Sequence, residues 1–217
     1  MGKTSKKDRL GIHTVGAPCL RKPNREVHKI TPAIKNAVGK MWQILEKVHG
    51  AGLSAPQIGV NKKIIIVNTG NIGEVITIFN PEITWQSESL SMNEEGCLSI
   101  PGALSQVWRP EEIKVKGLMM SGKVEEFEAE GIFAKALQHE IDHINGILMI
   151  DYSPGDQRKA VLDYFKVDEN SIEYELLKNE PLGPPPEKCV AKPTLYDASG
   201  AIADKKKTLY DSYGRKV

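Results

Sequence analysis

Little in the 217-residue sequence suits a secreted or membrane-spanning protein. Only 3 cysteines occur, Cys19, Cys97 and Cys189, too few and too scattered for a disulfide framework, which indicates a reducing compartment. No apolar run approaches the ~18 residues of a membrane helix, and no apolar segment follows the basic residues at the start, as it would in a secretion signal. We therefore expect neither secretion nor membrane binding.

An excess of charge of one sign is also lacking. The 29 Lys and Arg residues nearly balance the 28 Asp and Glu residues, so charge gives no sign of direct nucleic-acid binding. We expect a cytoplasmic protein, and an organelle form of a processed chain stays open as an alternative.

Hydrophobic periodicity predicts two helices and several strands. The first helix begins with Thr31 as N-cap and Pro32 as its first residue and ends at Gly50, and the second runs from about 131 to 145, followed by Gly146. Strand patterns cover 63–68, 75–80, 83–89, 112–120 and 123–129. Helices and strands are segregated rather than alternating, which predicts the α+β class.

The character of the chain changes after its first 152 residues. We predict one main domain over 1–152, a C-terminal helix within 153–180, and a Pro-rich linker with a short repeat tail over 181–217. The repeats TLYDASG (194–200) and TLYDSYG (208–214) each suit a strand followed by a turn, so two β-hairpins are predicted. A disordered tail with chance similarity is the alternative.

The strongest chemical signal is an H-E-x-x-H motif on the second predicted helix, at His139-Glu140-Ile141-Asp142-His143. Residues four apart share a helix face, so both imidazoles can bind one cation. Glu140 is then close enough to take a proton from a metal-bound water. Asp142 faces away from the pair, where it either orients a ligand histidine or faces solvent.

A third metal ligand has two candidate sources. No histidine follows His143, so a zinc endopeptidase would need a downstream carboxylate such as Glu169 or Glu173. Upstream, Cys97 stands in a polar, Gly-containing stretch where the backbone can approach a metal, although many cysteines are simply buried.

The loop GAGLSAPQ at 50–57 joins the first helix to the first strand. Gly50 and Gly52 permit close approach by another backbone, and the Gln57 amide can donate and accept hydrogen bonds. By itself this is no more than a Gly-rich loop.

Taken together, the motifs GAGLSAPQ (50–57), EGCLS (95–99) and HEIDH (139–143) resemble the peptide deformylase family over residues 10 to about 152. Ser54 stands where the family usually has Ala, and Ala51 where a larger aliphatic residue is common. Residues 180–217 match nothing in the family.

The resemblance implies small antiparallel sheets around a central metal-binding helix that carries HExxH, with a C-terminal extension. It also implies an enzyme that removes the N-formyl group from N-terminal formylmethionine of newly made proteins and releases formate. Cys97, His139 and His143 would hold one divalent metal ion, Fe²⁺ by family resemblance, with Zn²⁺ or Ni²⁺ able to occupy the site.

The resemblance also implies roles for further residues. Glu140 would act as general base, and the Gln57 side chain and the Leu98 N–H would form an oxyanion hole. Formyl-methionyl nascent peptides would bind as an added strand. Apart from the resemblance, the Pro-rich segment is expected to act as a spacer that places the repeat tail to contact a partner such as the ribosome or a second copy of the chain. The expected substrate-binding residues are Gly50, Ala51, Gly52, Glu95 and Gly96, with Ile132 and Ala136 lining a pocket for the methionine.

Two other functions stay open at this point. One is the zinc endopeptidase, which would retain its metal after Cys97 is replaced. The other is an inactive deformylase-like module that binds peptides or the ribosome, and the presence of Glu140 and Gln57 argues against it.

Overall fold

The computed structural model describes residues 7–70 and 74–183, and these form two compact units. One unit combines the described parts of Met1–Pro18, Met92–Trp108 and Leu148–Val217, and the other combines Cys19–Ser91 with Arg109–Ile147. The two predicted hairpins at 194–200 and 208–214 lie outside the described residues. Within the described residues no helix has both the length and the apolar character needed to cross a membrane.

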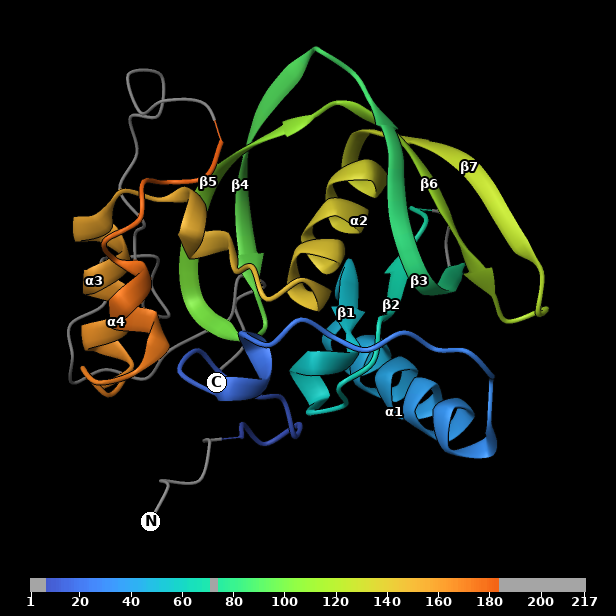
Figure 1. The fold of residues 1–217 in the computed structure, drawn as a ribbon, viewed down its shortest axis with the longest axis horizontal. Helices are drawn as coiled ribbons and strands as arrows, with labels where there is room; N and C mark the ends of the chain where they lie inside the picture. Colours follow the sequence, from blue (N-terminus) through green and yellow to red (C-terminus); the bar gives the residue numbers. More distant parts are fainter. Residues whose placement is uncertain (1–6, 71–73, 184–217) are drawn as a thin grey trace. The chain divides into compact units, whose positions relative to one another are not determined.

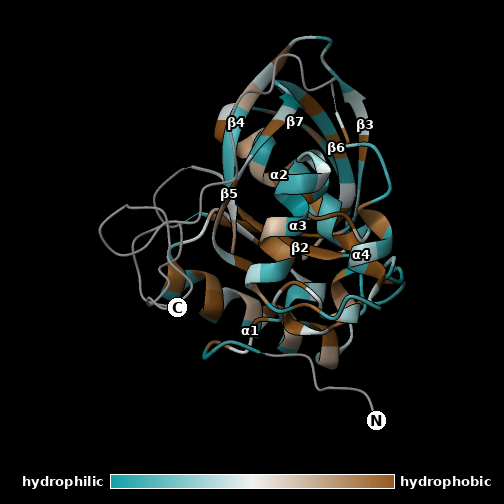
Figure 2. Cartoon of the chain, turned by 90° about the vertical axis from the view of Figure 1, so that its left-hand side faces the viewer, coloured by the Kyte–Doolittle hydropathy of each residue, from teal (hydrophilic) through white to brown (hydrophobic). Residues whose placement is uncertain are grey.

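A five-stranded antiparallel sheet forms the framework of the second unit (Figure 1). Its order is β1-β2-β3-β6-β7, so β1 and β7 are the edges. The strands are β1 (Gly52–Ser54), β2 (Ile64–Asn68), β3 (Val75–Gln86), β6 (Glu112–Met119) and β7 (Val124–Glu130). The sequence IIIVN makes β2 strongly hydrophobic (Figure 2), and its four apolar residues are buried.

Strand β3 is continuous where the sequence predicts two separate strands, 75–80 and 83–89. The pairing with β6 shifts register between Phe79 and Glu82 and again between Ile83 and Trp85. Such irregularities let Pro81, which has no N–H to donate, lie within a long strand. The gap between the two predicted strands is therefore an irregular stretch inside one continuous strand.

Helix α1 (Pro32–Val48) begins as predicted. The Thr31 side chain accepts a hydrogen bond from the Ile34 N–H at 3.3 Å, and Pro32 occupies the first turn. The helix ends two residues before the predicted Gly50, because His49 adopts the left-handed conformation as C-cap.

Helix α2 (Gly131–Ile144) confirms the second predicted helix and carries the HEIDH sequence. Gly146 follows the C-cap Asn145 with a φ of +81°, and a Cβ there would meet the Arg21 carbonyl oxygen at 2.8 Å. The helix packs on the sheet through a shared apolar core, to which it contributes Ala134, Ala136, Leu137, Ile141 and Ile144. The further prediction that this helix is central to all the sheets stays a prediction.

A two-stranded sheet of β4 (Leu90–Cys97) and β5 (Ile100–Pro110) was not predicted from the sequence. In β5 the buried positions alternate, but they hold Ser105 and Arg109, whereas Leu104 and Trp108 are only partly buried. Because some buried positions of β5 hold polar residues, its sequence does not show the alternation of apolar and polar residues that predicts a strand.

Beyond the second unit the chain forms η3 (Met149–Tyr152), α3 (Gly155–Tyr164) and α4 (Ile172–Leu176), so the predicted C-terminal helical region contains two short helices. The buried Arg158 side chain holds them together, donating to the Leu176 carbonyl at 3.0 Å and to the Asn179 carbonyl. The Leu182 N–H donates to the Asp151 carbonyl at 2.9 Å. The packed chain therefore continues past the predicted boundary at 180.

Candidate active site

His139 and His143 lie one turn apart on α2, as the motif predicts. Their ring centroids are 4.9 Å apart, with the rings nearly perpendicular at 83°. His139 is half-buried and His143 is buried. Both imidazoles therefore lie on the same side of the helix, as shared ligation of one cation requires.

Cys97 is the last residue of β4, and its side chain is buried. Its sulfur accepts a hydrogen bond from the Ser99 N–H at 3.4 Å, and the Ser99 carbonyl accepts one from the Val15 N–H at 2.8 Å. The short turn between β4 and β5 thus holds the thiol in a defined position.

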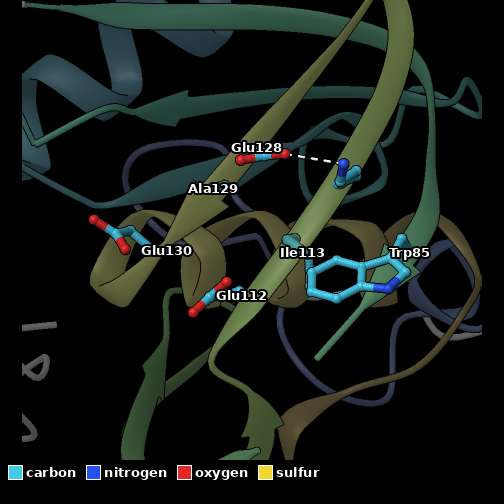
Figure 3. A pocket seen from close by; sticks show the side chains of 7 residues that line it. Trp85, Glu112, Ile113, Glu128, Ala129 and Glu130 are labelled. Carbon is cyan, nitrogen blue, oxygen red and sulfur yellow. Dashed lines mark ion pairs between the residues drawn. The ribbon is translucent and has the colours of Figure 1, made fainter. Parts of the chain in front are cut away.

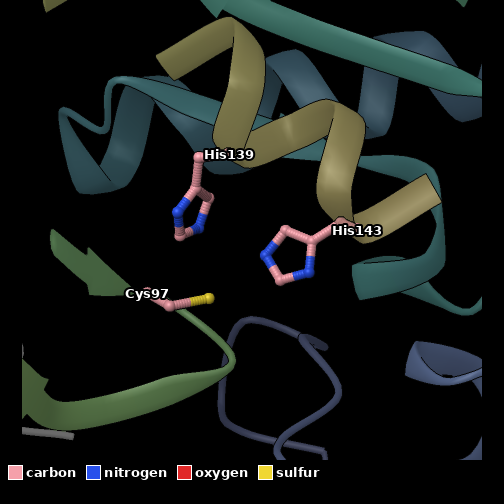
Figure 4. A group of neighbouring side chains, drawn as sticks. All are labelled: Cys97, His139 and His143. Atoms are coloured by element: carbon pink, nitrogen blue, oxygen red, sulfur yellow. The ribbon is translucent and has the colours of Figure 1, made fainter. Parts of the chain in front are cut away.

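Cys97, His139 and His143 form a possible metal site, with one candidate ligand atom from each residue and all of these atoms within 4.8 Å of one another (Figure 4). The donor set suits a divalent transition metal, because a thiolate and two imidazoles are the sulfur and nitrogen ligands that such ions bind. Three protein ligands also leave room for a water or substrate at a further position. The residues present therefore fit the metal that the sequence predicts.

The protonation state of His143 also suits a ligand role. Burial, followed by the electrostatic influence of His139, Arg21 and Arg109, holds the pKa of His143 well below its ordinary value of 6.5. The imidazole is therefore neutral at pH 7, and a neutral ring has a lone pair to give to a metal.

Asp142, next to His143 on α2, pairs with Arg109 at 2.9 Å, and both side chains are largely buried. The Asp142 carboxylate is therefore held in an ion pair and does not face solvent, which was one of its two predicted settings. No local pattern in the sequence could have identified Arg109 as the partner of Asp142, because the two residues are 33 positions apart.

Glu140 is buried on α2 and lies against the backbone of Gly52 in β1. A Cβ added at Gly52 would be 2.7 Å from both Cγ and Oε1 of Glu140. The second glycine of the loop motif is thus needed so that the carboxylate can occupy its position.

Replacing Gly52 with Ala should therefore displace the Glu140 side chain. The resemblance implies formate release with Glu140 as general base, so we expect that release to fall sharply when the carboxylate is displaced. Metal content should be retained, since none of the three predicted ligands is moved directly. Gly39→Ala is the matched control, because a Cβ at this other glycine of the same unit meets nothing within 4 Å. Steady-state kinetics and metal analysis of both variants check this, and full activity of Gly52→Ala would contradict it.

Gln57 lies in the short helix η2 (Ala55–Ile58) and is buried. Its Oε1 accepts hydrogen bonds from the Ser54 backbone N–H at 2.8 Å and from the Ser54 hydroxyl at 2.9 Å. The amide is therefore held by its oxygen end.

The family model for polypeptide deformylase matches residues 10–159. The chain belongs to the polypeptide deformylase family. A peptide deformylase of Halothermothrix orenii is 44% identical over 142 residues, which are 65% of this chain and 92% of that protein. A crystal structure of a peptide deformylase from Legionella pneumophila matches with a TM-score of 0.67 and 38% identity, covering 71% of this chain and 94% of that one.

A peptide deformylase from Synechococcus elongatus, solved in complex with actinonin, matches with a TM-score of 0.62 and 34% identity over 69% of this chain and 83% of that one. These similarities confirm the predicted enzyme. The deformylase is a metal-dependent hydrolase that removes the N-formyl group from newly made proteins, and neither the endopeptidase nor the inactive module is favoured.

The other predicted site residues of the deformylase lie on several elements. Gly50 and Ala51 precede β1, and the Ala51 carbonyl accepts from the Asn68 N–H at 2.8 Å. Glu95 and Gly96 lie in β4, and Leu98 follows Cys97 in the turn.

Ile132 and Ala136, the residues expected to line a methionine pocket, differ in exposure. The Ile132 side chain is 78% exposed, whereas Ala136 is 9% exposed and belongs to the core between α2 and the sheet. Their role in substrate binding stays a prediction.

A separate hollow of about 660 Å³ lies over β3, β6 and β7 (Figure 3). Lys114 pairs there with Glu128 at 2.9 Å, and its ammonium lies 5.9 Å from the centre of the Trp85 ring. None of the predicted site residues lines this hollow. The residues that line this hollow are therefore different from those of the candidate active site.

Proposed function

We propose that Cys97, His139 and His143 hold one Fe²⁺ ion and that Glu140, Gln57 and Leu98 carry out the deformylation. The observation that carries this proposal is the grouping of the three ligand atoms within 4.8 Å. When bound, a divalent ion supplies Lewis acidity, which polarises a carbonyl and lowers the pKa of a water.

Glu140 acts as the general base in this mechanism. Its carboxylate takes a proton from the water that attacks the formyl carbon and then gives a proton to the departing amine nitrogen. Formate leaves with the formyl carbon, and the peptide keeps a free N-terminal amine. The low exposure of Glu140, 4%, supports this role, because few other waters compete for the carboxylate.

Gln57 and Leu98 stabilise the charge that develops during the attack. As the carbonyl becomes tetrahedral, its oxygen gains negative charge, and the Gln57 Nε2–H and the Leu98 backbone N–H donate to it. The buried position of Gln57 and the hydrogen bonds that hold its Oε1 support this assignment.

The formyl-methionyl substrate binds as an extended strand. Strand β1 supports this, because it is an edge of the five-stranded sheet and its described partner is β2 alone. Gly50, Ala51 and Gly52 would pair on this side, and Glu95 and Gly96 would contribute from β4. Ile132 and Ala136 would contact the methionine side chain.

The experiment that tests the proposal is formate release from formyl-Met-Ala-Ser. Protein loaded anaerobically with Fe²⁺ is compared with protein loaded with Zn²⁺ or Ni²⁺, with metal content measured in each sample. We expect the iron form to turn over fastest. Equal or faster turnover by the zinc form would contradict iron as the productive ion, and no formate from any form would contradict the whole assignment.

We further propose that residues 184–217 are not part of the catalytic domain and serve to bind a partner such as the ribosome in the cytoplasm, where formylated chains are made. The end of the family match at 159 supports this, as does the position of every proposed site residue before 144.

A chain that ends at Gly183 should therefore stay folded and cleave formyl-Met-Ala-Ser at nearly the full rate. This end point keeps the Leu182 hydrogen bond to Asp151, which an end at 180 would remove. Circular dichroism and steady-state kinetics check the result. Unfolding or loss of activity would make residues 184–217 part of the catalytic domain.

A further inference from the structure

Ser54 offers two hydrogen-bond donors to the same atom of Gln57. The backbone N–H and the side-chain hydroxyl of Ser54 reach Oε1 at 2.8 and 2.9 Å, and the side chains are 0% and 1% exposed. Any residue at position 54 other than Pro could supply the first contact. Only the second contact depends on the serine hydroxyl.

The two donors of Ser54 fix the orientation of the Gln57 amide, with Oε1 toward Ser54. A reversed amide would turn its NH₂ group toward the Ser54 backbone N–H, and two donors cannot bond to each other. The hydroxyl adds a second bond to the correct orientation and restricts rotation of the amide within its buried position. The Nε2 donor is therefore fixed on the side of the amide away from Ser54.

The hydroxyl also changes the strength of the opposite end of the amide. Hydrogen bonds in series polarise one another, so donation to Oε1 makes the Nε2 hydrogens better donors. The stronger Nε2–H donor stabilises its acceptor more as that acceptor becomes more negative. The acceptor is the formyl oxygen, which carries the most negative charge in the transition state.

We infer that the Ser54 hydroxyl is a positioning residue for deformylation that acts through Gln57 by fixing and polarising its amide. The inference rests on the proposed role of Gln57 in the oxyanion hole.

The test is a double-mutant cycle on the metal-loaded full chain with Ser54→Ala, Gln57→Ala and both together. Ser54→Ala removes one oxygen from a buried position and keeps the backbone contact. We expect kcat to fall about threefold to tenfold, the range for one lost hydrogen bond, with KM nearly unchanged. In the Gln57→Ala background, Ser54→Ala should then have no effect on kcat.

Ser153→Ala is the matched control. Its hydroxyl is also buried and contacts the Ser105 hydroxyl at 3.4 Å, and it has no proposed part in the reaction. Thermal unfolding of all variants separates stability from catalysis. A purely structural Ser54 would lower the melting temperature and leave kcat of the folded enzyme unchanged.

The outcomes distinguish the inference from the proposed function on which it rests. If Gln57→Ala lowers kcat but Ser54→Ala does not, or lowers it equally in both backgrounds, the inference about Ser54 is overturned and the role of Gln57 stands. If Gln57→Ala leaves kcat unchanged, the proposed oxyanion role is overturned and the inference falls with it.

Discussion

Replacing Glu140 with Ala should reduce formate release by at least about a hundredfold while the protein keeps its metal. The carboxylate is proposed as a base, and the proposed ligand atoms belong instead to Cys97, His139 and His143. Turnover and metal content, measured on the same preparation, check the prediction. Loss of the metal from Glu140→Ala would contradict this proposal, because it would indicate that Glu140 is a metal ligand and not only a base.

Two variants control for loss of volume and loss of a buried carboxylate. Glu140→Gln keeps the size of the side chain and should be as inactive as Glu140→Ala, because an amide cannot accept the proton. Glu173 is also buried, on α4, and is one of the carboxylates that an endopeptidase would need as third ligand. Glu173→Gln should retain both activity and metal.

Replacing Cys97 with Ser should weaken metal retention more than about tenfold or change which ion is held. A hydroxyl is a harder and weaker ligand than a thiolate, and even residues that only support metal ligands commonly contribute about 10- to 100-fold in affinity. Dialysis against a chelator followed by metal analysis gives the affinity, and formate release should fall with the iron content.

Cys19→Ser is the control for this change, because Cys19 is the other cysteine among the described residues and is half-buried. It should retain its iron. Iron affinity that is the same in Cys97→Ser and the unchanged chain would exclude Cys97 as a ligand and favour a third ligand from elsewhere.

Much of the candidate site could be predicted because its signals are local. The spacing of His139 and His143 specifies a shared helix face wherever a helix forms, and the helix itself follows from apolar periodicity and from Gly146 beyond its end. Thr31 and Pro32 likewise mark the start of α1 through contacts within one turn. Interactions between residues three or four apart on a helix can be predicted directly from their spacing in the sequence.

Strands were less predictable, because their pairing is not local. Strand β3 continues through Pro81 only because β6 accommodates two register shifts. Strand β5 was not predicted, because it buries the polar residues Ser105 and Arg109, and Arg109 meets the Asp142 carboxylate across 33 residues of sequence. A polar residue can be buried when its partner is supplied, and the sequence does not say where the partner is.

By itself the sequence determined the family and the reaction, and it predicted three metal ligands, because three ordered motifs carry those residues. Only the tertiary structure decided why Gly52 must lack a side chain and how Gln57 is oriented. The first depends on a carboxylate 88 positions further along the chain, and the second on two donors converging on one oxygen. Both are distances between atoms, and packing sets those distances.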